Sequence, residues 1–299
     1  MRISSLSQPQ RMLATLEAGN TQIQKLQDQL ATQQKQTLPS EDPLNAARTA
    51  AVTQQQAMTA QYQQNITSAN DALTRQDTLL SSMSDLVLSL QDQLRSMNNS
   101  TQSTTQTAGY TAQLSSLSEG IVNLLNSQDA QGHYIFAGTN NTQPPVIKVE
   151  GEYQWQGNDE AANVQVGQQQ RISAGTAVSS LFAAGSDPLI LLNQIGKLTQ
   201  SSNPSLADSS TLSALIQKSS DAADKVSSAR ASIGSRQNQL TQLSDMYTDL
   251  SAANSEVLNH LQSTDTAETT LQLQSWMKTV EYSSKAYGLM NQFSLFDVI

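Results

Sequence analysis

Apolar residues recur along most of this chain at alternating steps of three and four, the spacing that places them on one face of a helix. The clearest run is Tyr62, Ile66, Ala69, Leu73, Gln76, Leu80, Met83, Val87, Leu90, Leu94 and Met97. A seven-residue spacing returns later at Val226, Ile233, Leu240, Tyr247, Asn254 and Leu261. These runs predict two long helices that pack along a continuous seam.

Proline and acidic residues indicate where the first long helix begins. Pro39 and Pro43 interrupt the helical spacing, and Asp42 before Pro43 supplies an N-cap and a preset first turn. We expect this helix to run from Pro43 to about Met97, a length of about 80 Å at 1.5 Å per residue. A polar loop is expected over residues 98–109, and the apolar spacing resumes over residues 110–124 as a helical hairpin.

Shorter helices are expected at both ends of the chain. The first one is interrupted by Gly19 and Asn20, and its apolar residues are Met12, Leu16, Ile23, Leu26 and Leu30. Asp265, with Glu268 three positions later, resembles a capping box and predicts the start of the last helix. That helix carries Leu271, Leu273, Trp276, Met277, Val280, Tyr287 and Met290.

The middle of the chain follows a different pattern. Eight of the 13 glycines lie between Gly132 and Gly196, where short alternating runs are separated by turn residues. We expect two to four strands between Thr139 and about Gly185. The predicted fold is mostly α, with a long antiparallel helical rod or coiled coil formed by the N- and C-terminal segments and a small β-rich inserted domain.

This pattern predicts three parts. Residues 1–42 and 264–299 form a terminal helical assembly domain, residues 43–138 and 190–263 form a helical rod, and residues 139–189 form a β-rich outer insert. We expect the N- and C-terminal segments to lie side by side in one bundle that neighbouring copies complete. The reason is that an isolated helix with one apolar stripe and no partner has marginal stability in water.

Composition favours a building block over a catalyst. Charged residues make up 14% of the chain, against about 25% in ordinary globular proteins, and aromatic residues only 4%. A polar, weakly charged surface is suited to packing against copies of itself, because little charge is desolvated. The net charge of −9 and the scattered cations argue against binding of nucleic acid or an anionic membrane.

Targeting and redox signals are few. The chain has no apolar run near 18 residues, so membrane insertion is not expected. Its N-terminal residues lack the basic stretch followed by an apolar stretch that marks a secretory leader, so Sec-type export is not expected. There are 0 cysteines, which excludes disulfides and thiolate chemistry.

Candidate catalytic groups are isolated. His133 and His260 each lack a second ligand at metal-binding spacing. The neighbouring carboxylates are interpreted as solvated loop acids; they are Glu150 with Glu152 and Asp159 with Glu160. No phosphate-binding or nucleophile motif is present. The sequence therefore predicts no enzyme activity, no catalytic or metal site and no cofactor.

Some seam and terminal residues have two interpretations. Gln76 and Asn254 either set the register of the helices or face a groove. The terminal aromatic residues are either core residues or contacts between subunits, and their position in the last segment favours contacts. The hypothesised assembly interface consists of Leu16, Ile23, Leu26, Leu30, Trp276, Met277, Val280, Tyr287, Met290, Phe293, Leu295 and Phe296.

Several motifs in order resemble one family over nearly the whole chain. They are Met1-Arg2-Ile3-Ser4, Leu38-Pro39-Ser40-Glu41-Asp42-Pro43, Gly132-His133-Tyr134-Ile135-Phe136-Ala137-Gly138, Ala229-Arg230 through Asn238, Asp265-Thr266-Ala267-Glu268 and Ser294-Leu295-Phe296. The chain resembles the FlgL-type hook–filament junction proteins of the bacterial flagellum, which are relatives of flagellin. The turn at Pro39, Ser40, Glu41, Asp42 and Pro43 and the Tyr-Ile-Phe-Ala-Gly segment are specific in combination.

The chain departs from the family pattern at two places. Relatives often have Ser-Gly before the proline turn, where this sequence has Gln33-Gln34, and Glu41 replaces an Asp. Flagellin resembles both ends but usually lacks the flanking prolines and the Tyr-Ile-Phe-Ala-Gly segment, so a junction protein is favoured over a filament subunit.

The resemblance implies a structural role. The family forms a ring between hook and filament by self-assembly, in contact with the first hook–filament junction protein and flagellin. Its members are secreted through the flagellar type III export channel with a cytoplasmic chaperone and no cleaved signal peptide, and their terminal helices become ordered on assembly. The expected location is the extracellular flagellum.

Two alternatives remain from the sequence. The chain is a minor flagellin if it forms filaments by itself. From another class, it is a secreted coiled-coil adhesin or translocator whose β-rich insert binds a ligand. An enzyme would require a site grafted onto the insert.

Overall fold

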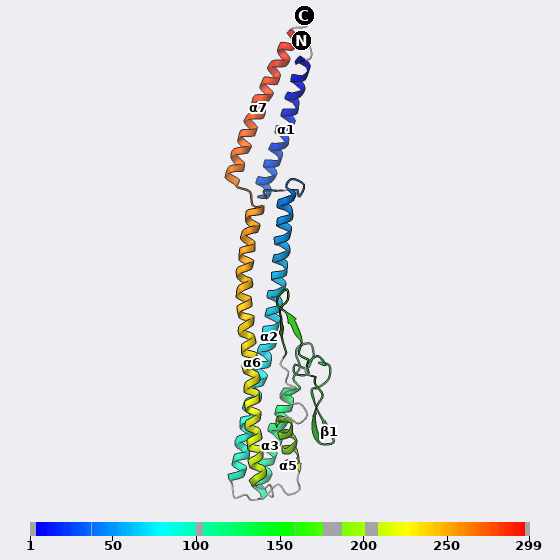
Figure 1. The fold of residues 1–299 in the computed structure, drawn as a ribbon, viewed down its shortest axis with the longest axis vertical. Helices are drawn as coiled ribbons and strands as arrows, with labels where there is room; N and C mark the ends of the chain where they lie inside the picture. Colours follow the sequence, from blue (N-terminus) through cyan, green and yellow to red (C-terminus); the bar gives the residue numbers. More distant parts are fainter. Residues whose placement is uncertain are drawn as a thin grey trace. The chain divides into compact units, whose positions relative to one another are not determined.

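The computed structural model describes the backbone of residues 4–36, 38–99, 104–158, 160–175, 187–200 and 209–296. Within these ranges, the side chains of residues 4–9, 104–107, 187 and 290–296 lie outside the description. The helices are α1 (Ser4–Thr32), α2 (Pro43–Asn99), α3 (Thr104–Leu125), α5 (Asp187–Gln200), α6 (Ser209–Gln262) and α7 (Thr266–Phe296). The strands are β1 (Val146–Val149), β2 (Glu152–Trp155), β3 (Asn163–Gln165) and β4 (Arg171–Ser173) (Figure 1). This content confirms the predicted mostly helical fold with a small β-rich insert.

The chain divides into two compact units. One contains Met1–Thr59 and Asp249–Ile299, and the other contains Ala60–Thr248. The boundary crosses both long helices, α2 and α6, so each unit holds a part of each.

In the unit of residues 60–248, α2 and α6 run antiparallel along the predicted seam. Hydrogen bonds join Gln63 to Thr248, Gln237 to Thr74 and Ser209 to Asn98, so the α6 partner number falls as the α2 number rises. The seam residues are buried; they include Leu73, Leu80, Met83, Leu90 and Leu94 of α2 and Val226, Ile233 and Leu240 of α6. The spacing in the sequence therefore identified the main core of this unit.

The segment between α2 and α3 differs from the prediction. A loop was expected over residues 98–109, but α2 continues to Asn99 and α3 begins at Thr104. Polar residues such as Thr and Gln have only modestly lower helix propensity than Ala, and no proline interrupts this segment. Polarity alone was therefore a poor indicator of a loop.

The described part of the insert contains two separate two-stranded antiparallel sheets, β1 with β2 and β3 with β4. This confirms the expected two to four strands. The β1–β2 hairpin turns at Glu150 and Gly151, whose φ angles are 52° and 89°. Positive φ at both turn residues is the property of a type I′ turn, which matches the twist of the strands it joins.

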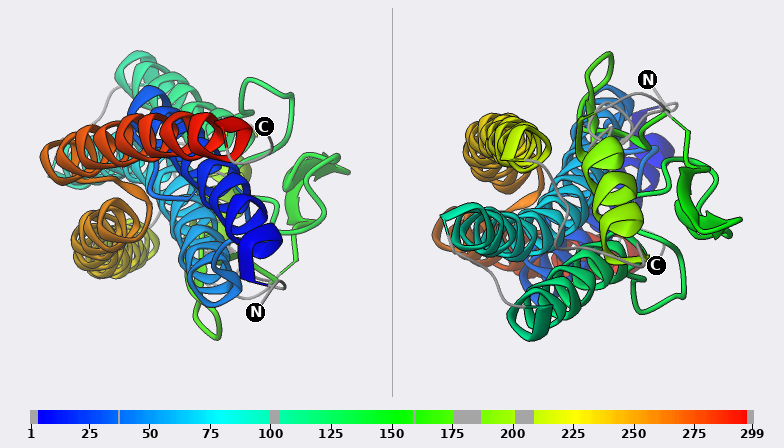
Figure 2. Two further views of the ribbon diagram at one scale, coloured as in Figure 1. Left: turned by 90° about the horizontal axis from the view of Figure 1, so that it is seen from above. Right: turned by 90° about the horizontal axis from the view of Figure 1, so that it is seen from below.

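Helix α5 was not predicted as a separate element. It begins at the sequence Asp187-Pro188, and it buries Leu189, Leu191, Leu192 and Ile195. These residues contribute to its packing against α3 and β2. Seen from below, α5 lies beside α3 (Figure 2). The sequence contained a signal for the start of this helix, because the same Asp-Pro pair, Asp42-Pro43, stands at the start of α2.

In the other unit, α1 and α7 pack side by side as an antiparallel pair (Figure 1). Leu26 of α1 is 2% exposed. Gly19, which interrupts the apolar spacing, is buried against Val280 and Trp276 of α7. The missing side chain at Gly19 thus allows a close approach of the two helices. The parts of α2 and α6 in this unit are joined by Gln56, whose amide donates to Ser251 Oγ at 2.7 Å.

Candidate assembly surfaces and the paired connectors

The predicted family turn caps helix α2. Asp42 Oδ1 accepts a hydrogen bond from the backbone N–H of Asn45 at 3.0 Å, and Pro43 is the first helical residue. The Gln36 amide donates to the carbonyl oxygens of Leu38 and Asp42, which closes the turn that contains Pro39 and Ser40. These bonds confirm the expected N-cap at Asp42.

Glu41 links this turn to α1, because its carboxylate lies 3.3 Å from Lys25 Nζ. Both side chains are partly exposed, so the ion pair contributes little to stability and mainly orients the turn.

The connector between α1 and α2 is bonded to the connector between α6 and α7. The backbone N–H of Lys35 donates to Gln262 O at 2.6 Å, and that of Thr264 donates to Gln33 O at 3.1 Å. Gln34 and Ser263 form an antiparallel bridge. We call these two segments, residues 33–36 and 262–265, the paired connectors. They link the segment that follows α1 to the segment that precedes α7.

Gln33 ends α1 in a left-handed conformation with φ of 57°. This conformation is usual for glycine after a helix and costs other residues about 1–2 kcal/mol. This chain adopts the left-handed conformation there without a glycine.

Asp265 caps α7, as predicted. Its Oδ1 accepts from the backbone N–H groups of Ala267 at 2.9 Å and Glu268 at 3.1 Å. The Glu268 carboxylate accepts from the Gln272 side chain. The capping residue at Asp265 is therefore confirmed.

The structure places the hypothesised interface residues of α1 toward α7. Leu26 is buried, and Leu16, Ile23 and Leu30 are half-buried. On α7, Val280 and Tyr287 are half-buried, whereas Trp276 is 36% exposed and Met277 is 53% exposed. The side chains of Met290, Phe293, Leu295 and Phe296 lie outside the described part of the chain.

Helix α7 carries a second apolar face that the sequence reasoning did not assign to the interface. Leu271, Tyr282 and Leu289 are 67%, 66% and 56% exposed. Their spacing of 11 and 7 residues places them on one side of a helix with 3.6 residues per turn, opposite Val280. We call these three residues the outer face of α7. The pairing with α1 uses one side of α7 and leaves this face uncovered.

The β3–β4 hairpin is held by side chains of both long helices in the unit of residues 60–248. Gln76 of α2 donates to Ala174 O at 3.0 Å, and Arg236 Nη1 of α6 donates to Gly175 O at 2.7 Å and to Ser173 O at 3.1 Å. Gln76 therefore anchors the insert, which explains a polar residue on the apolar seam. Asn254, the other polar seam residue, is 8% exposed in the other unit.

The Tyr-Ile-Phe-Ala-Gly segment joins α3 to the insert. Phe136 and Ala137 are 1% and 0% exposed, so they belong to the core. Gly138 has φ of 74°, and a Cβ atom there would lie 2.1 Å from Asn158 Oδ1. Asn158 in turn accepts from the Thr139 N–H at 2.9 Å. The glycine is required both by its backbone conformation and by the side chain packed against it.

Arg230, in the Ala-Arg motif, joins the two long helices. Its Nε lies 2.9 Å from Asp77 Oδ1, and its Nη2 lies 3.5 Å from Asp77 Oδ2. The hydrogen bond to Asp77 raises the pKa of Arg230. Arg230 thus links α6 to α2 through an ion pair.

The titratable groups do not assemble into a reaction centre in the described part of the chain. His133 lies 3.7 Å from Asp129, and His260 lies 3.8 Å from Glu256 one turn away. The Glu152 carboxylate is paired with Lys197 at 2.8 Å. Asp159, the acid next to Glu160, lies outside the described residues. Among the residues described, no three His, Cys, Asp or Glu side chains gather as a metal site.

The helices in the described ranges are too polar or too short for a lipid bilayer, and none qualifies as a membrane span.

Known proteins share both sequence and fold with this chain. Residues 3–141 match the model of the bacterial flagellin N-terminal helical region. The chain is 24% identical to flagellar hook-associated protein 3 of Escherichia coli K12 over 317 aligned residues, which cover 100% of this chain and 99% of that protein.

Two solved structures share the fold. A flagellar hook-associated protein from Vibrio parahaemolyticus superposes with a TM-score of 0.68 at 24% identity, covering 75% of this chain and 100% of that one. The flagellar junction protein FlgL from Legionella pneumophila superposes with a TM-score of 0.58 at 13% identity, covering 71% of this chain and 100% of that one. These two likenesses are likenesses of fold over most of this chain.

Proposed function

Because this chain belongs to the flagellin superfamily as a protein of the hook-associated protein 3 type, we propose that it is a structural subunit that joins the hook and the filament of the bacterial flagellum. It self-assembles into a ring and adapts the hook to the filament, and it does so without catalysis. The structural observation that carries the proposal is the uncovered outer face of α7, in a helix that the chain pairs on one side only.

The outer face of α7 supports assembly by simple burial. Leu271, Tyr282 and Leu289 are large apolar side chains that are each more than half exposed. Burying apolar surface stabilises by about 25 cal/mol per Å². A neighbouring subunit that covers this face gains that free energy.

The charge pattern is compatible with close packing of copies. Only 14% of the residues are charged, so a contact between subunits desolvates few ions.

We assign separate roles to the parts of the chain within this proposal. Residues 1–42 and 264–299 form the assembly domain and include the hypothesised interface, residues 43–138 and 190–263 form the rod, and residues 139–189 form an outer insert. The anchoring of the insert by Gln76 and Arg236 supports a role for it as a fixed part of each subunit.

The proposed partners follow from the position between two tubes. They are other copies of the chain in the ring, the first hook–filament junction protein on one side and flagellin on the other. A cytoplasmic chaperone is proposed for the export stage. The proposed location is the extracellular flagellum, reached by type III export without a cleaved signal peptide.

The experiment is an assembly reaction on isolated hooks that already carry the first junction protein. Purified chain is added, and electron microscopy records whether a ring forms and whether flagellin then extends a filament. We expect one added ring and filament growth only after it. Filament growth without this chain, or no ring at all, would contradict the proposal.

A parallel reaction separates a junction protein from a filament subunit. The chain is mixed with short filament seeds in the absence of flagellin. A junction protein adds at most a cap, whereas long filaments made of this chain alone would identify a minor flagellin.

A further inference from the structure

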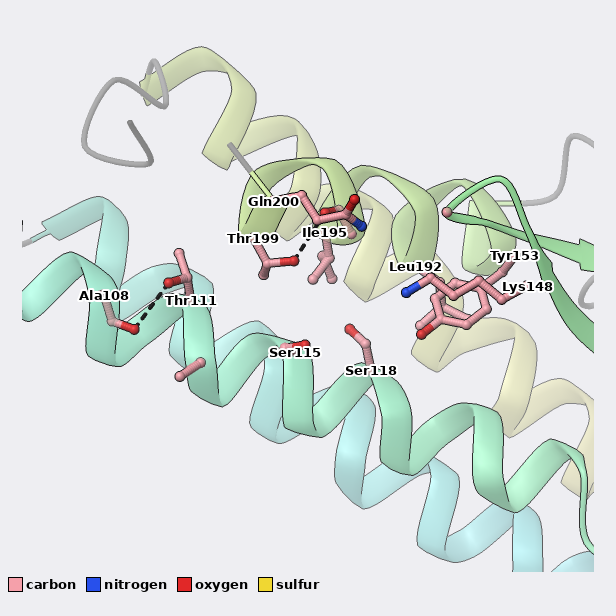
Figure 3. Close-up of a pocket in the computed structure, with 13 residues that line it drawn as sticks. Ala108, Thr111, Ser115, Ser118, Lys148, Tyr153, Leu192, Ile195, Thr199 and Gln200 are labelled. Atoms are coloured by element: carbon pink, nitrogen blue, oxygen red, sulfur yellow. Dashed lines mark hydrogen bonds between the residues drawn. The ribbon is translucent and has the colours of Figure 1, made fainter. Parts of the chain in front are cut away.

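A cavity of about 550 Å³ opens between α3, the β1–β2 hairpin and α5. Figure 3 shows its walls: Ser115 and Ser118 lie on α3, Thr199 and Gln200 on α5, and Lys148 and Tyr153 on the hairpin. Its volume lies within the range of small-molecule sites, about 300–1,000 Å³. None of the assembly residues described above lines it.

Ser118 is the first indication that this cavity holds a ligand. The residue is 4% exposed, and its Oγ has no hydrogen-bond partner among the described residues. In Figure 3 the hydroxyl points from α3 into the space toward α5. A buried hydroxyl without a partner is destabilising, so a ligand that bonds to it recovers free energy.

The other polar groups that line the cavity indicate the charge and hydrogen-bonding character of the ligand. Thr111 and Thr199 already donate their hydroxyl protons to the carbonyls of Ala108 and Gly196 at 3.0 Å. Lys148 supplies the single charge of the lining, and its Nζ lies 5.3 Å from the centre of the Tyr153 ring. Among the lining residues none is acidic. The available donors therefore converge on an anion.

Tyr153 adds a neutral donor. Burial raises the pKa of its phenol, and the negative charge of Glu119 raises it further. The hydroxyl consequently stays protonated at neutral pH and can donate. The remaining lining is apolar or small, with Leu192 and Ile195 on α5 and Ala108 and Ala112 on α3.

We propose that this cavity binds a carboxylate, held at Lys148 and Ser118. The carboxylate belongs either to a small organic acid or to an acidic side chain of a second copy. The chemistry at the cavity is the same for both sources, because the donors recognise the carboxylate.

The test titrates the full chain with sodium hexanoate and follows backbone amide signals by NMR. We expect saturable shifts at Ser118, Gly196 and Tyr153, and at least about tenfold weaker binding of hexanamide, which lacks the charge. Ser118→Ala and Lys148→Gln should each weaken hexanoate about 3- to 10-fold. Arg95→Gln, which removes an equal charge from an exposed residue of α2 that does not line the cavity, should leave binding unchanged.

The outcomes are distinct. Absence of saturable shifts, equal binding of hexanamide, or equal effects of Lys148→Gln and Arg95→Gln would overturn the proposal. Self-association of the free chain that hexanoate reverses would assign the carboxylate to a second copy. Binding of hexanoate by a monomeric chain would assign it to a small molecule.

Discussion

Gly19 of α1 lies directly against Val280 of α7, so that a Cβ atom at position 19 would come within 2.6 Å of Val280 Cγ2. We predict that Gly19→Ala destabilises the α1–α7 pair by about 1–3 kcal/mol, the usual cost of overpacking. Thermal unfolding followed by helical circular dichroism measures the effect.

Gly288 of α7 provides the matched control, because a Cβ atom there has nothing within 4 Å. Gly288→Ala should instead stabilise by about 0.5–1 kcal/mol, since alanine is the better helix former. Adding Val280→Ala to Gly19→Ala should recover part of the loss. Equal effects of the two glycine substitutions would mean that the helices do not approach at Gly19.

The outer face of α7 should be needed for assembly and not for folding. Replacing Leu271, Tyr282 and Leu289 with glutamine should abolish ring formation on hooks, while the melting temperature of the free chain stays nearly unchanged, because these side chains are already exposed. The control is Leu88→Gln on α2, which is 46% exposed and outside the proposed interface. Normal rings from the triple variant would exclude this face.

Replacing Gln33 with glycine should increase the stability of the folded chain. Its φ of 57° favours glycine, so Gln33→Gly should raise stability by up to about 1 kcal/mol, and Gln33→Val should lower it. Urea denaturation compares the variants. Gln34→Gly is the control, because Gln34 has no positive φ and glycine only adds freedom to the unfolded chain. A loss at Gln33→Gly equal to that at Gln34→Gly would contradict the left-handed end of α1.

Asp129 should make stability depend on pH in the acid range. The backbone N–H of His133, and more weakly that of Gln131, lower the pKa of its carboxyl group. A lowered pKa in the folded state stabilises above the unfolded pKa, and this contribution is lost as the pH falls through the folded value. Asp129→Asn should therefore be less stable than the wild type at pH 7, and the difference should shrink below about pH 4. Urea titrations at both pH values check this, and a constant difference would refute it.

Arg236 should hold the β3–β4 hairpin in place. Arg236 Nη1 donates to the carbonyl oxygens of both Ser173 and Gly175. Arg236→Ala removes this shared donor, which should lower the free energy of unfolding by about 1–3 kcal/mol. Amide hydrogen exchange in residues 163–173 should accelerate. Arg230→Ala, which breaks the ion pair with Asp77 between the helices, is the control and should not affect the hairpin selectively.

The long helices were predictable because their seam repeats over many turns. Val226, Ile233 and Leu240 recur at seven-residue steps, and all three are buried. The caps at Asp42 and Asp265 were predictable for a related reason, since a short polar acceptor before a helix satisfies free N–H groups locally. Local chemistry of this kind needs no knowledge of the tertiary structure.

Other features depend on contacts between residues far apart in the sequence. Gln76 looked like an interruption of the seam, and only the position of Ala174 explains it. Helix α5 was missed because its apolar run follows a glycine-rich region and its partners, α3 and β2, lie elsewhere in the chain. The outer face of α7 became visible only when Val280 was placed against α1, which identified the opposite side as uncovered.

The paired connectors have a mechanical consequence. Because Lys35 and Thr264 bond to Gln262 and Gln33 across the two segments, tension applied to one chain end is divided between two covalent routes. Neither route can extend until the bonds to the other break in turn. A pull on this unit is therefore shared by the two connectors and is not borne by a single linker.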